Sequence, residues 1–564
     1  MLLFLCLLAD SAQTDNRPDY GDTLVEATTA EPSVLIPMLA GDSISHEVAG
    51  LIFNGLVKYA PDLSLTGDLA QSWDIDGRSV LQRERGLTIT FHLRHGVTWT
   101  DGVEFTADDV MYGYKTIIDD KTPTAYKEDY LQVKKAEVVD KYTFRVTYDK
   151  PFASALSSWG NLTVLPKHLL EGKDITKNPL TRNPTGLGPY KLKRWTPGQE
   201  VLLSSNHDYF EGRPYIDNYL FRVIPDQSTM FMELKAGGID FMGLTPLQYK
   251  RQTDSTYFRE NFNKYRYPVF SYTYLGFNLK HPIFSDKRVR QAIAYAIDKR
   301  EIVSIVLLGL GSESTGPYVP NTWPYNPNVK RYEYNPQKAR ELLAQAGWVV
   351  GQCGCTTENG QKEVVRHDGQ KGASRTGNKK DSYGDGILYK DGRPLEFTIS
   401  TSMGNNARIK AATIIQWRLK QIGIRVNIRV LEWSTFINEF IDKRRFEAVL
   451  LGWAIGMDAD QYDIWHSSKT KEKEFNFISY SDSEVDRLLE EGRRTFDIEK
   501  RKKAYYKIQE ILAEDVPYVF LYVPDALPIV HNRFNGIDPS PIGIGYNLPK
   551  WYVPKDQQKN KLEP

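Results

Sequence analysis

The chain has 564 residues, of which 41% are hydrophobic and 25% are charged, and its formal net charge is +1. This length accommodates two to four domains, and the composition is ordinary for a soluble globular protein. The near-zero net charge excludes a global field that would draw the chain to nucleic acid or to an acidic membrane, so no nucleic-acid partner is predicted.

The N-terminus carries an apolar run over residues 1–9 that is too short to span a bilayer. It resembles the end of a secretory signal, and small residues follow it, so residues 1–20 are predicted to be a signal-like tail. Cys6 offers an alternative, attachment of a lipid. The chain has three cysteines, and only Cys353 and Cys355 follow the tail, which also fits export. We therefore expect a periplasmic or otherwise extracytoplasmic protein, with membrane anchoring as a variant.

Patterns of strands and helices alternate along the first half of the chain. The stretch "LTITFHLR" alternates apolar and polar residues from Leu87 and predicts a strand. A helix is predicted to follow, with Thr106 as its N-cap and Asp109 three residues later in a near capping box. Residues 284–309 have apolar groups at helical spacing and predict one long amphipathic helix.

The second half continues the alternation and predicts an α/β fold. One helix is predicted to have Asn335 as N-cap, Pro336 in its first turn and Gly347 just past its end. The other predicted elements are a helix over 406–423, strands over 424–433 and 444–453, two helices within 482–514, and extended chain over 516–530.

One segment departs from this pattern. Residues 349–393 are poor in apolar groups and rich in glycine, lysine and small polar residues. We predict a flexible surface insertion, centred on 351–380, because such a segment cannot bury enough apolar surface to fold compactly. Cys353 and Cys355 lie in it as a C-x-C pair without other ligands at zinc spacing, so no metal site is predicted.

Common catalytic signatures are missing from the sequence. The stretch "HEVAG" at His46 lacks the second histidine of a zinc protease helix, and no G-x-S-x-G elbow occurs. We therefore predict no catalytic residue, metal or cofactor. A secreted hydrolase with paired carboxylates such as Asp458 and Asp460 stays an alternative, because carboxylates from any part of a chain can meet in space.

Several blocks resemble one family, the extracellular solute-binding proteins of peptide-type ABC importers, known as family 5. These blocks are "GLTITFHLRHGVTWTDGVEFTADDVMYGYK" (86–115), "NPTGLGPYKLKRW" (183–195), "YLGFNLKHPIFSDKRVRQAIAYAIDKREIV" (274–303) and "LLGWAIGMDADQYDIWHSS" (450–468). The resemblance extends over roughly residues 21–550 and leaves out the insertion.

The resemblance implies a bilobal type II periplasmic-binding-protein fold with two hinge crossovers and an extra domain inserted in the first lobe. We place the crossovers near 271–279 and 519–525. The expected division is 21–50, 184–274 and 526–564 for the first lobe, 51–183 for the extra domain, and 275–525 for the second lobe.

The resemblance also implies a function. A monomer of this kind captures a short peptide or similar solute between closing lobes and delivers it to the permease and ATPase subunits of an ABC importer. Other solutes, such as an oligosaccharide, an opine or a metal chelate, stay open as alternatives, because a fold does not fix its ligand.

The block at 450–468 carries the predicted site. In peptide-binding relatives a carboxylate in the loop after G-W accepts the ammonium group of the ligand, so Asp458 and Asp460 are candidates and Trp453 is a candidate cleft wall. The alternative for the two aspartates is helix capping or solvation. Five further candidates come from position alone, with packing or a hinge hydrogen bond as their alternatives, and they are Thr28, Thr29, Tyr274, Asn278 and Trp323.

Overall fold

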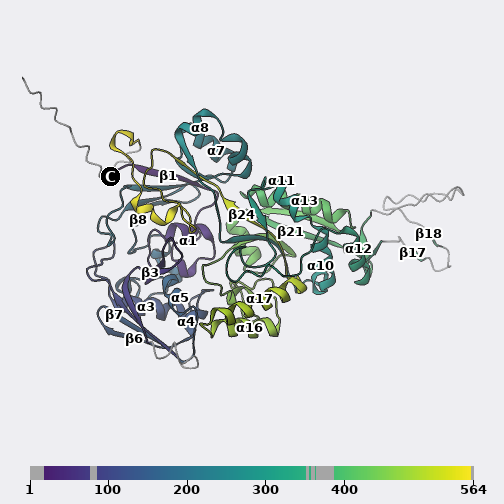
Figure 1. The fold of residues 1–564 in the computed structure, drawn as a ribbon, viewed down its shortest axis with the longest axis horizontal. Coiled ribbons are helices and arrows are strands. Elements are labelled where there is room, and N and C mark those ends of the chain that lie inside the picture. Colours follow the sequence, from purple (N-terminus) through teal and green to yellow (C-terminus); the bar gives the residue numbers. More distant parts are fainter. Residues whose placement is uncertain (1–17, 77–85, 351–354, 357–361, 364–385, 560–564) are drawn as a thin grey trace, which may run out of the picture.

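The computed structural model describes residues 18–76, 86–350, 355–356, 362–363 and 386–559. Two large mixed sheets lie side by side, and a smaller antiparallel sheet sits below the first of them in Figure 1. We call the first large sheet with its helices the first lobe, the second large sheet with its helices the second lobe, and the smaller sheet with its helices the extra domain. Within the described part of the chain, no helix is long and apolar enough to cross a membrane.

The sheet of the first lobe gathers strands from distant parts of the sequence. In spatial order its strands are β12 (Phe262–Lys264), β25 (Pro528–His531), β11 (Phe241–Gly243), β1 (Thr23–Thr28), β10 (Asn218–Val223), β9 (Glu200–Ser205) and β8 (Tyr190–Thr196). β1 lies parallel to β10 and β11, and the helices α1 (Ser43–Ala49), α7 (Gln227–Ala236) and α8 (Thr256–Asn261) belong to the same lobe. Since β1 is central, the chain that leaves its carboxyl end emerges in the middle of the sheet's edge, a common position for ligand sites.

The sheet of the second lobe is built from later residues. Its order is β13 (Tyr267–Pro268), β24 (Tyr518–Ala526), β14 (Ser271–Phe277), β23 (Ala448–Ala454), β21 (Glu396–Ser402) and β22 (Arg425–Leu431), with β15 (Gly311–Glu313) paired to β24. Its central strands are covered on both faces. In β23, Ala448 and Leu450 join one core cluster, whereas Val449 and Leu451 join the other. This burial on both faces explains why the strand reads as a continuous apolar run.

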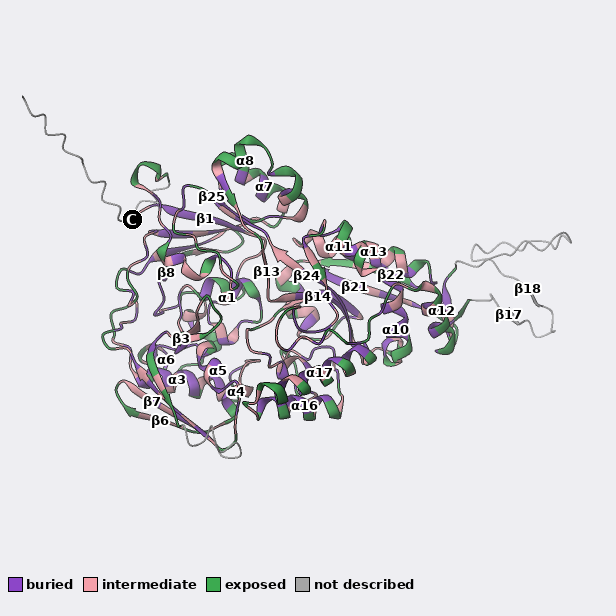
Figure 2. Ribbon diagram, viewed as in Figure 1, coloured by how far each residue is buried: buried purple, intermediate pink, exposed green. Residues whose placement is uncertain are grey.

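Helices cover both faces of the second sheet (Figures 1 and 2). The core on one face contains residues of α10 (Lys287–Ala296), α12 (Pro336–Gln345) and α13 (Asn406–Lys420), and the core on the other contains residues of α15 (Tyr462–Trp465), α16 (Ser483–Arg493) and α17 (Ile498–Asp515). The outer sides of α16 and α17 are exposed, in keeping with their charged sequences (Figure 2). The aromatic residues of this sequence are therefore used largely for packing.

The extra domain is a four-stranded antiparallel sheet in the order β4 (Ala70–Ile75), β5 (Leu87–Leu93), β7 (Thr143–Tyr148) and β6 (Val133–Asp140). The predicted strand from Leu87 is confirmed, because its alternate residues are all buried. The helices α3 (Ala107–Ile118), α4 (Glu128–Leu131) and α5 (Ala155–Asn161) accompany this sheet, and α3 has the predicted capping box of Thr106 and Asp109. Trp159 of α5 is fully buried in the same core.

The chain passes between the two large sheets twice. It leaves the first sheet after Lys264 and enters the second at Tyr267, and it returns between Ala526 and Pro528. The segment predicted as the first crossover, 271–279, contains β14, which is fully paired with β23 inside the second sheet. The predicted division into lobes, with a boundary after residue 274, stays a prediction.

The single helix predicted over 284–309 is wrong. The structure has α10 over Lys287–Ala296, a break at Ile297, and a separate helix α11 over Lys299–Ile305. Asp298 ends the continuity, because its side chain accepts a hydrogen bond from the backbone N–H of Glu301 as an N-cap. The cap at Asn335 is confirmed, since Oδ1 of Asn335 accepts from the backbone N–H of Lys338 at 2.9 Å.

The predicted insertion falls largely outside the described residues. Cys353 is not described, and around it the structure describes only the two-residue strands β17 (Cys355–Thr356) and β18 (Lys362–Glu363), which pair with each other. The predicted signal-like tail, with Cys6, also lies outside the described residues except for its last three positions.

Candidate ligand-binding cleft

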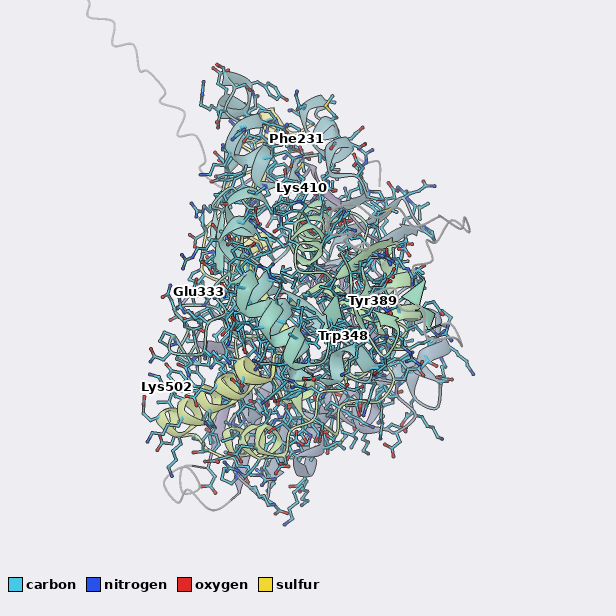
Figure 3. The ribbon with its side chains drawn as sticks, turned by 90° about the vertical axis from the view of Figure 1, so that its right-hand side faces the viewer. Phe231, Glu333, Trp348, Tyr389, Lys410 and Lys502 are labelled. Carbon is cyan, nitrogen blue, oxygen red and sulfur yellow. The ribbon has the colours of Figure 1, made fainter. Side chains whose placement is uncertain are left out.

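A cavity of about 1060 Å³ lies between the two lobes. The wall from the first lobe comprises the end of β1, the helix α1, the start of α7 and the loop after β11. The wall from the second lobe comprises the ends of β14, β21 and β23 and the first turn of α13. Figure 3 shows Lys410 of α13 and Phe231 of α7 toward one end of the molecule and Lys502 of α17 toward the other.

The strand β23 offers a backbone edge to this cavity. β23 pairs with β14 as far as Ala454, but it pairs with β21 only at Ala448 and Val449. The hydroxyl of Thr401 donates to the carbonyl of Leu450 at 2.9 Å, and the next residues, 451–454, all line the cavity. An unpaired strand edge presents N–H and C=O groups that an extended peptide can join by strand addition.

Three of the predicted site residues line the cleft. Thr28 is the last residue of β1 and Thr29 follows it, and the hydroxyl of Thr28 donates to the carbonyl of Ala30 at 2.9 Å. Trp453 lies on the opposite wall, at the end of β23. Its Nε1 donates to the hydroxyl of Tyr518 at 3.3 Å, which fixes the indole as a wall rather than a mobile side chain.

Three predicted residues lie outside the lining of the cleft. Tyr274 is fully buried and stacks on Tyr518, because its position in β14 points it into the core on one face of the sheet. Asn278 forms a structural hydrogen bond, since its Nδ2 donates to the carbonyl of Phe446 at 2.9 Å. Trp323 packs beside Tyr505 of α17. Each of these three residues thus makes the packing contact or structural hydrogen bond that was its alternative to a role in ligand binding.

Asp458 and Asp460 also lie outside the lining of the cleft, because each already has a cation of the protein. Asp458 accepts from Nη2 of Arg501 at 2.9 Å, and Asp460 accepts from Nε of Arg493 at 2.5 Å. Both aspartates also cap local backbone, since Asp458 accepts from the N–H of Asp460 and Asp460 accepts from the N–H of Tyr462, each at 2.9 Å. Neither carboxylate lines the cavity, and the expectation that one of them meets the ligand stays a prediction.

These ion pairs belong to a contact between the second lobe and the extra domain. Arg493 of α16 also pairs with Asp129 of α4, and Lys469 pairs with Glu128 of α4 at 2.7 Å. The side chains of Arg493 and Lys469 are each 6% exposed. The pKa of the Asp129 carboxyl is raised to about 8, chiefly by burial and also by neighbouring aspartates, against the opposing effect of Arg493. Buried pairs of this kind hold a specific geometry rather than adding much net stability.

The lobes also meet directly at Gly404. Its backbone φ is +84°, and a Cβ built there would lie 3.2 Å from the Cβ of Thr29 in the first lobe. Glycine satisfies both the left-handed backbone and the close approach. The second lobe thus approaches the first lobe at Gly404 and contacts the extra domain through the ion pairs of α4.

Sequence reasoning missed the charged residues that line the cleft, among them Glu26, Glu47 and Arg408. Glu26 lies in the otherwise apolar strand β1, and its carboxylate accepts a hydrogen bond from the hydroxyl of Tyr219. A charge inside a buried strand is a signal that could have pointed to it. Glu47 and Arg408 sit on the helices α1 and α13, where a charged residue is ordinary and carries no such signal.

The environment of the cleft changes the acidity of these groups. Burial raises the pKa of Glu26 well above its usual value, and the charge of Glu47 raises it further. Glu47 is exposed to the cavity between the lobes, and its partial removal from bulk water inside this cavity raises its pKa to about 7. Burial lowers the pKa of Arg408. Each shift reflects a charge that lacks a close counter-charge, which is typical of binding sites.

The cleft does not support the hydrolase alternative. Asp458 and Asp460 are held by Arg501 and Arg493 away from the cavity, so they are not placed to act as acid and base on a bound substrate. Among the residues that the structure describes, no group of three or more His, Cys, Asp or Glu side chains is arranged to hold a metal ion.

Comparison with known proteins decides the family. The model of the bacterial extracellular solute-binding proteins, family 5, matches residues 64–475. The oligopeptide-binding protein AppA of Bacillus subtilis is 32% identical over 561 residues, which cover 97% of this chain and 94% of AppA. The chain belongs to family 5 of the bacterial extracellular solute-binding proteins.

Solved structures agree with this assignment to the solute-binding proteins. The structure of AppA in complex with a nonapeptide has a TM-score of 0.83 and covers 96% of this chain and all of its own, at 31% identity. NikZ from Campylobacter jejuni in complex with Ni(L-His) has a TM-score of 0.80 at 27% identity, and covers 94% of this chain and 99% of its own. DppA from Helicobacter pylori in complex with the peptide STSA has a TM-score of 0.79 at 27% identity, and covers 95% and 98%. The predicted type II binding-protein fold is confirmed.

Proposed function

We propose that this family 5 solute-binding protein captures oligopeptides in extended conformation and presents them to the permease of an ABC importer. The observation that carries the proposal is the free edge of β23 over residues 451–454, which lines a cavity of about 1060 Å³. A peptide laid along this edge pairs with the backbone irrespective of its sequence. A volume at the upper limit of small-molecule pockets also suits a chain of several residues.

The walls of the cleft fit the same ligand. Trp453 and Phe475 form an aromatic surface on the second lobe, with ring centroids 5.4 Å apart, and Thr28 and Thr29 offer polar groups on the first. Aromatic surfaces accept varied apolar side chains, whereas backbone pairing supplies the common part of the affinity. AppA and DppA, whose structures resemble this one, hold a nonapeptide and the peptide STSA.

The proposal includes the setting in which the protein works. A monomer closes its lobes on the peptide and meets the membrane permease, which ATPase subunits energise. It acts outside the cytoplasm, either released after removal of residues 1–20 or held at the membrane by a lipid on Cys6. The boundaries of the lobes follow the two passages between the sheets, at residues 265–266 and at residue 527.

The test is to identify what the protein carries. The protein is purified from its own extracytoplasmic medium without denaturation, and its ligand is then released by unfolding and analysed by mass spectrometry. We expect a mixture of peptides of several residues with varied sequences. Release of a single sugar, opine or metal chelate in stoichiometric amount, with no peptide, would contradict the proposal.

A further inference from the structure

The two walls of the cleft differ in charge, because the lysine and arginine side chains of its described lining all come from the second lobe. In the part of the first-lobe wall that the structure describes, the acidic side chains are those of Glu26, Asp42 and Glu47, and no lysine or arginine lines it. His46 is on the same wall, and burial lowers its pKa. Asp42 is occupied as the N-cap of α1, where it accepts from the backbone N–H of Ser45 at 2.9 Å.

The second-lobe wall carries the cations. Arg408 and Lys410 lie on the first turns of α13, and Lys473 lies beside Asp442 on the same wall. Glu474 is nearby, and its carboxylate accepts from the backbone N–H of Lys471 at 2.7 Å. At the crossover, Asp525 is paired with Arg266 at 2.7 Å.

Arg408 is a cation without a counter-charge. Among the described residues no carboxylate lies within ion-pair distance of its guanidinium, and its Nε is buried without a hydrogen-bond partner. Gly452 makes room for it, because a Cβ on that residue would lie 2.6 Å from a terminal nitrogen of Arg408. A buried charge that the protein leaves unpaired is costly, so its position in a ligand cavity points to a ligand group of opposite charge.

The carboxylates on the facing wall are unpaired in the same way. Glu26 is 7% exposed, and the contact that holds it is the hydroxyl of Tyr219 rather than a cation. Glu47 faces the cavity from α1, and no described lysine or arginine pairs with it. Arg408 on the second-lobe wall therefore lacks an anionic partner, and Glu26 and Glu47 on the first-lobe wall lack a cationic one.

We propose that the ligand bridges the cleft with a cationic group held by Glu47 and Glu26 and an anionic group held by Arg408. For a peptide, these groups are its ammonium and carboxylate ends or charged side chains at those places. This inference rests on the proposed function, and it moves recognition of the ammonium from Asp458, which Arg501 occupies, to the first-lobe wall.

The test uses nonapeptides built only from amino acids with neutral side chains, so that the two ends are their only charges. A random library is screened by affinity-selection mass spectrometry, and one selected peptide is titrated by calorimetry with free ends, N-acetylated, C-amidated, and N-acetylated with one internal lysine. The proteins are the full chain, Glu47→Gln, Arg408→Gln, and the controls Glu341→Gln and Arg340→Gln on α12, outside the cleft.

We expect acetylation to weaken binding to the full chain by at least about thirtyfold, and to the Glu47→Gln variant by less than about fivefold. Amidation should likewise weaken binding to the full chain but not to Arg408→Gln, and the controls should behave as the full chain. If the internal lysine restores the affinity of the N-acetylated peptide, the acidic wall holds a cationic side chain of the ligand instead of its N-terminus. Either source of the cationic group supports the inference.

Two results overturn the inference, and they differ from failure of the proposed function. If acetylation or amidation has the same effect on the full chain and on the matching variant, the charged walls do not hold the ligand, although peptide binding stands. If the full chain retains no library peptide in any form, the proposed function itself fails, and the inference with it.

Discussion

Asp458 accepts a hydrogen bond from Nη2 of Arg501 at 2.9 Å, so this carboxylate has its cation within the protein. The neighbouring Asp460 has the same relationship with Arg493, whose guanidinium reaches across to Asp129 of the extra domain. The acidic loop after Trp453 therefore organises a contact between domains. Asp460, through Arg493, holds the second lobe against α4, and neither carboxylate lines the cavity.

The buried position of Arg493 gives the first prediction. Arg493→Gln should lower the free energy of unfolding by about 3 kcal/mol, because Asp460 and Asp129 lose a shared buried cation. Arg487→Gln, on the exposed face of the same helix, is the matched control and should cost less than about 1 kcal/mol. Urea denaturation measures both, and equal losses would show that the cluster at Arg493 behaves as a surface pair.

The contact between Lys469 and Glu128 gives a second prediction. Glu128 does not contact the ligand, but Glu128→Gln should weaken peptide binding by roughly three- to thirtyfold. The reason is that the pair stabilises the closed form of the protein, which binds peptide, and we expect the pair to be absent from the open form. The measurement is calorimetric titration with a selected nonapeptide, with Glu341→Gln as the control. Unchanged affinity of the Glu128→Gln variant would mean that this pair has no part in closure.

Closure itself should be visible by small-angle scattering, as a smaller radius of gyration with peptide than without it.

Asp68 predicts a specific dependence of stability on pH. Burial raises its pKa in the folded protein to about 6, above its ordinary value in an unfolded chain of about 3.9. The stabilising contribution of the protonated form is therefore complete below about pH 4 and is lost as the pH rises through about 6.

The variant Asp68→Asn removes this titration. The difference in unfolding free energy between variant and full chain should shift in favour of the variant by about 2–3 kcal/mol from pH 4 to pH 7. Urea denaturation at intervals of pH measures the difference. Parallel curves for the two proteins would argue that Asp68 titrates alike in the folded and unfolded states.

Tryptophan fluorescence separates two residues that the sequence alone could not tell apart. Trp453 lines the cleft, whereas Trp323 packs beside Tyr505 away from it. Peptide binding should change the emission of the full chain, and Trp453→Phe should remove a large part of the change. Trp323→Phe should retain it. The reverse order would place the ligand away from the end of β23.

The sequence predicts local elements well where a physical rule acts within a few residues. The alternation in β5, the capping box at Thr106 and the N-cap at Asn335 are all found as expected. The long helix from 284 to 309 fails because its apolar spacing continues across the break, while the N-cap at Asp298 is only one of several polar residues in the pattern.

The site is less predictable because its charges are paired in space. Nothing near Asp458 in the sequence indicates that Arg501 will reach it, and the two residues meet only because α17 packs behind the loop. The burial of Tyr274 depends on which face of β14 it occupies, which the apolar strand does not reveal. By contrast, Thr28, Thr29 and Trp453 lie at the ends of strands, and strand ends do line the cleft.

The most direct measurement of the central claim is equilibrium dialysis of the ligand-free protein against three solute classes at once: a nonapeptide library, a mixture of oligosaccharides, and nickel with histidine. Mass spectrometry and elemental analysis identify what the protein retains. We predict that it retains peptides, at one per chain, and that an excess of the other two classes does not displace them. Retention of sugar or nickel chelate with no peptide bound would contradict the account.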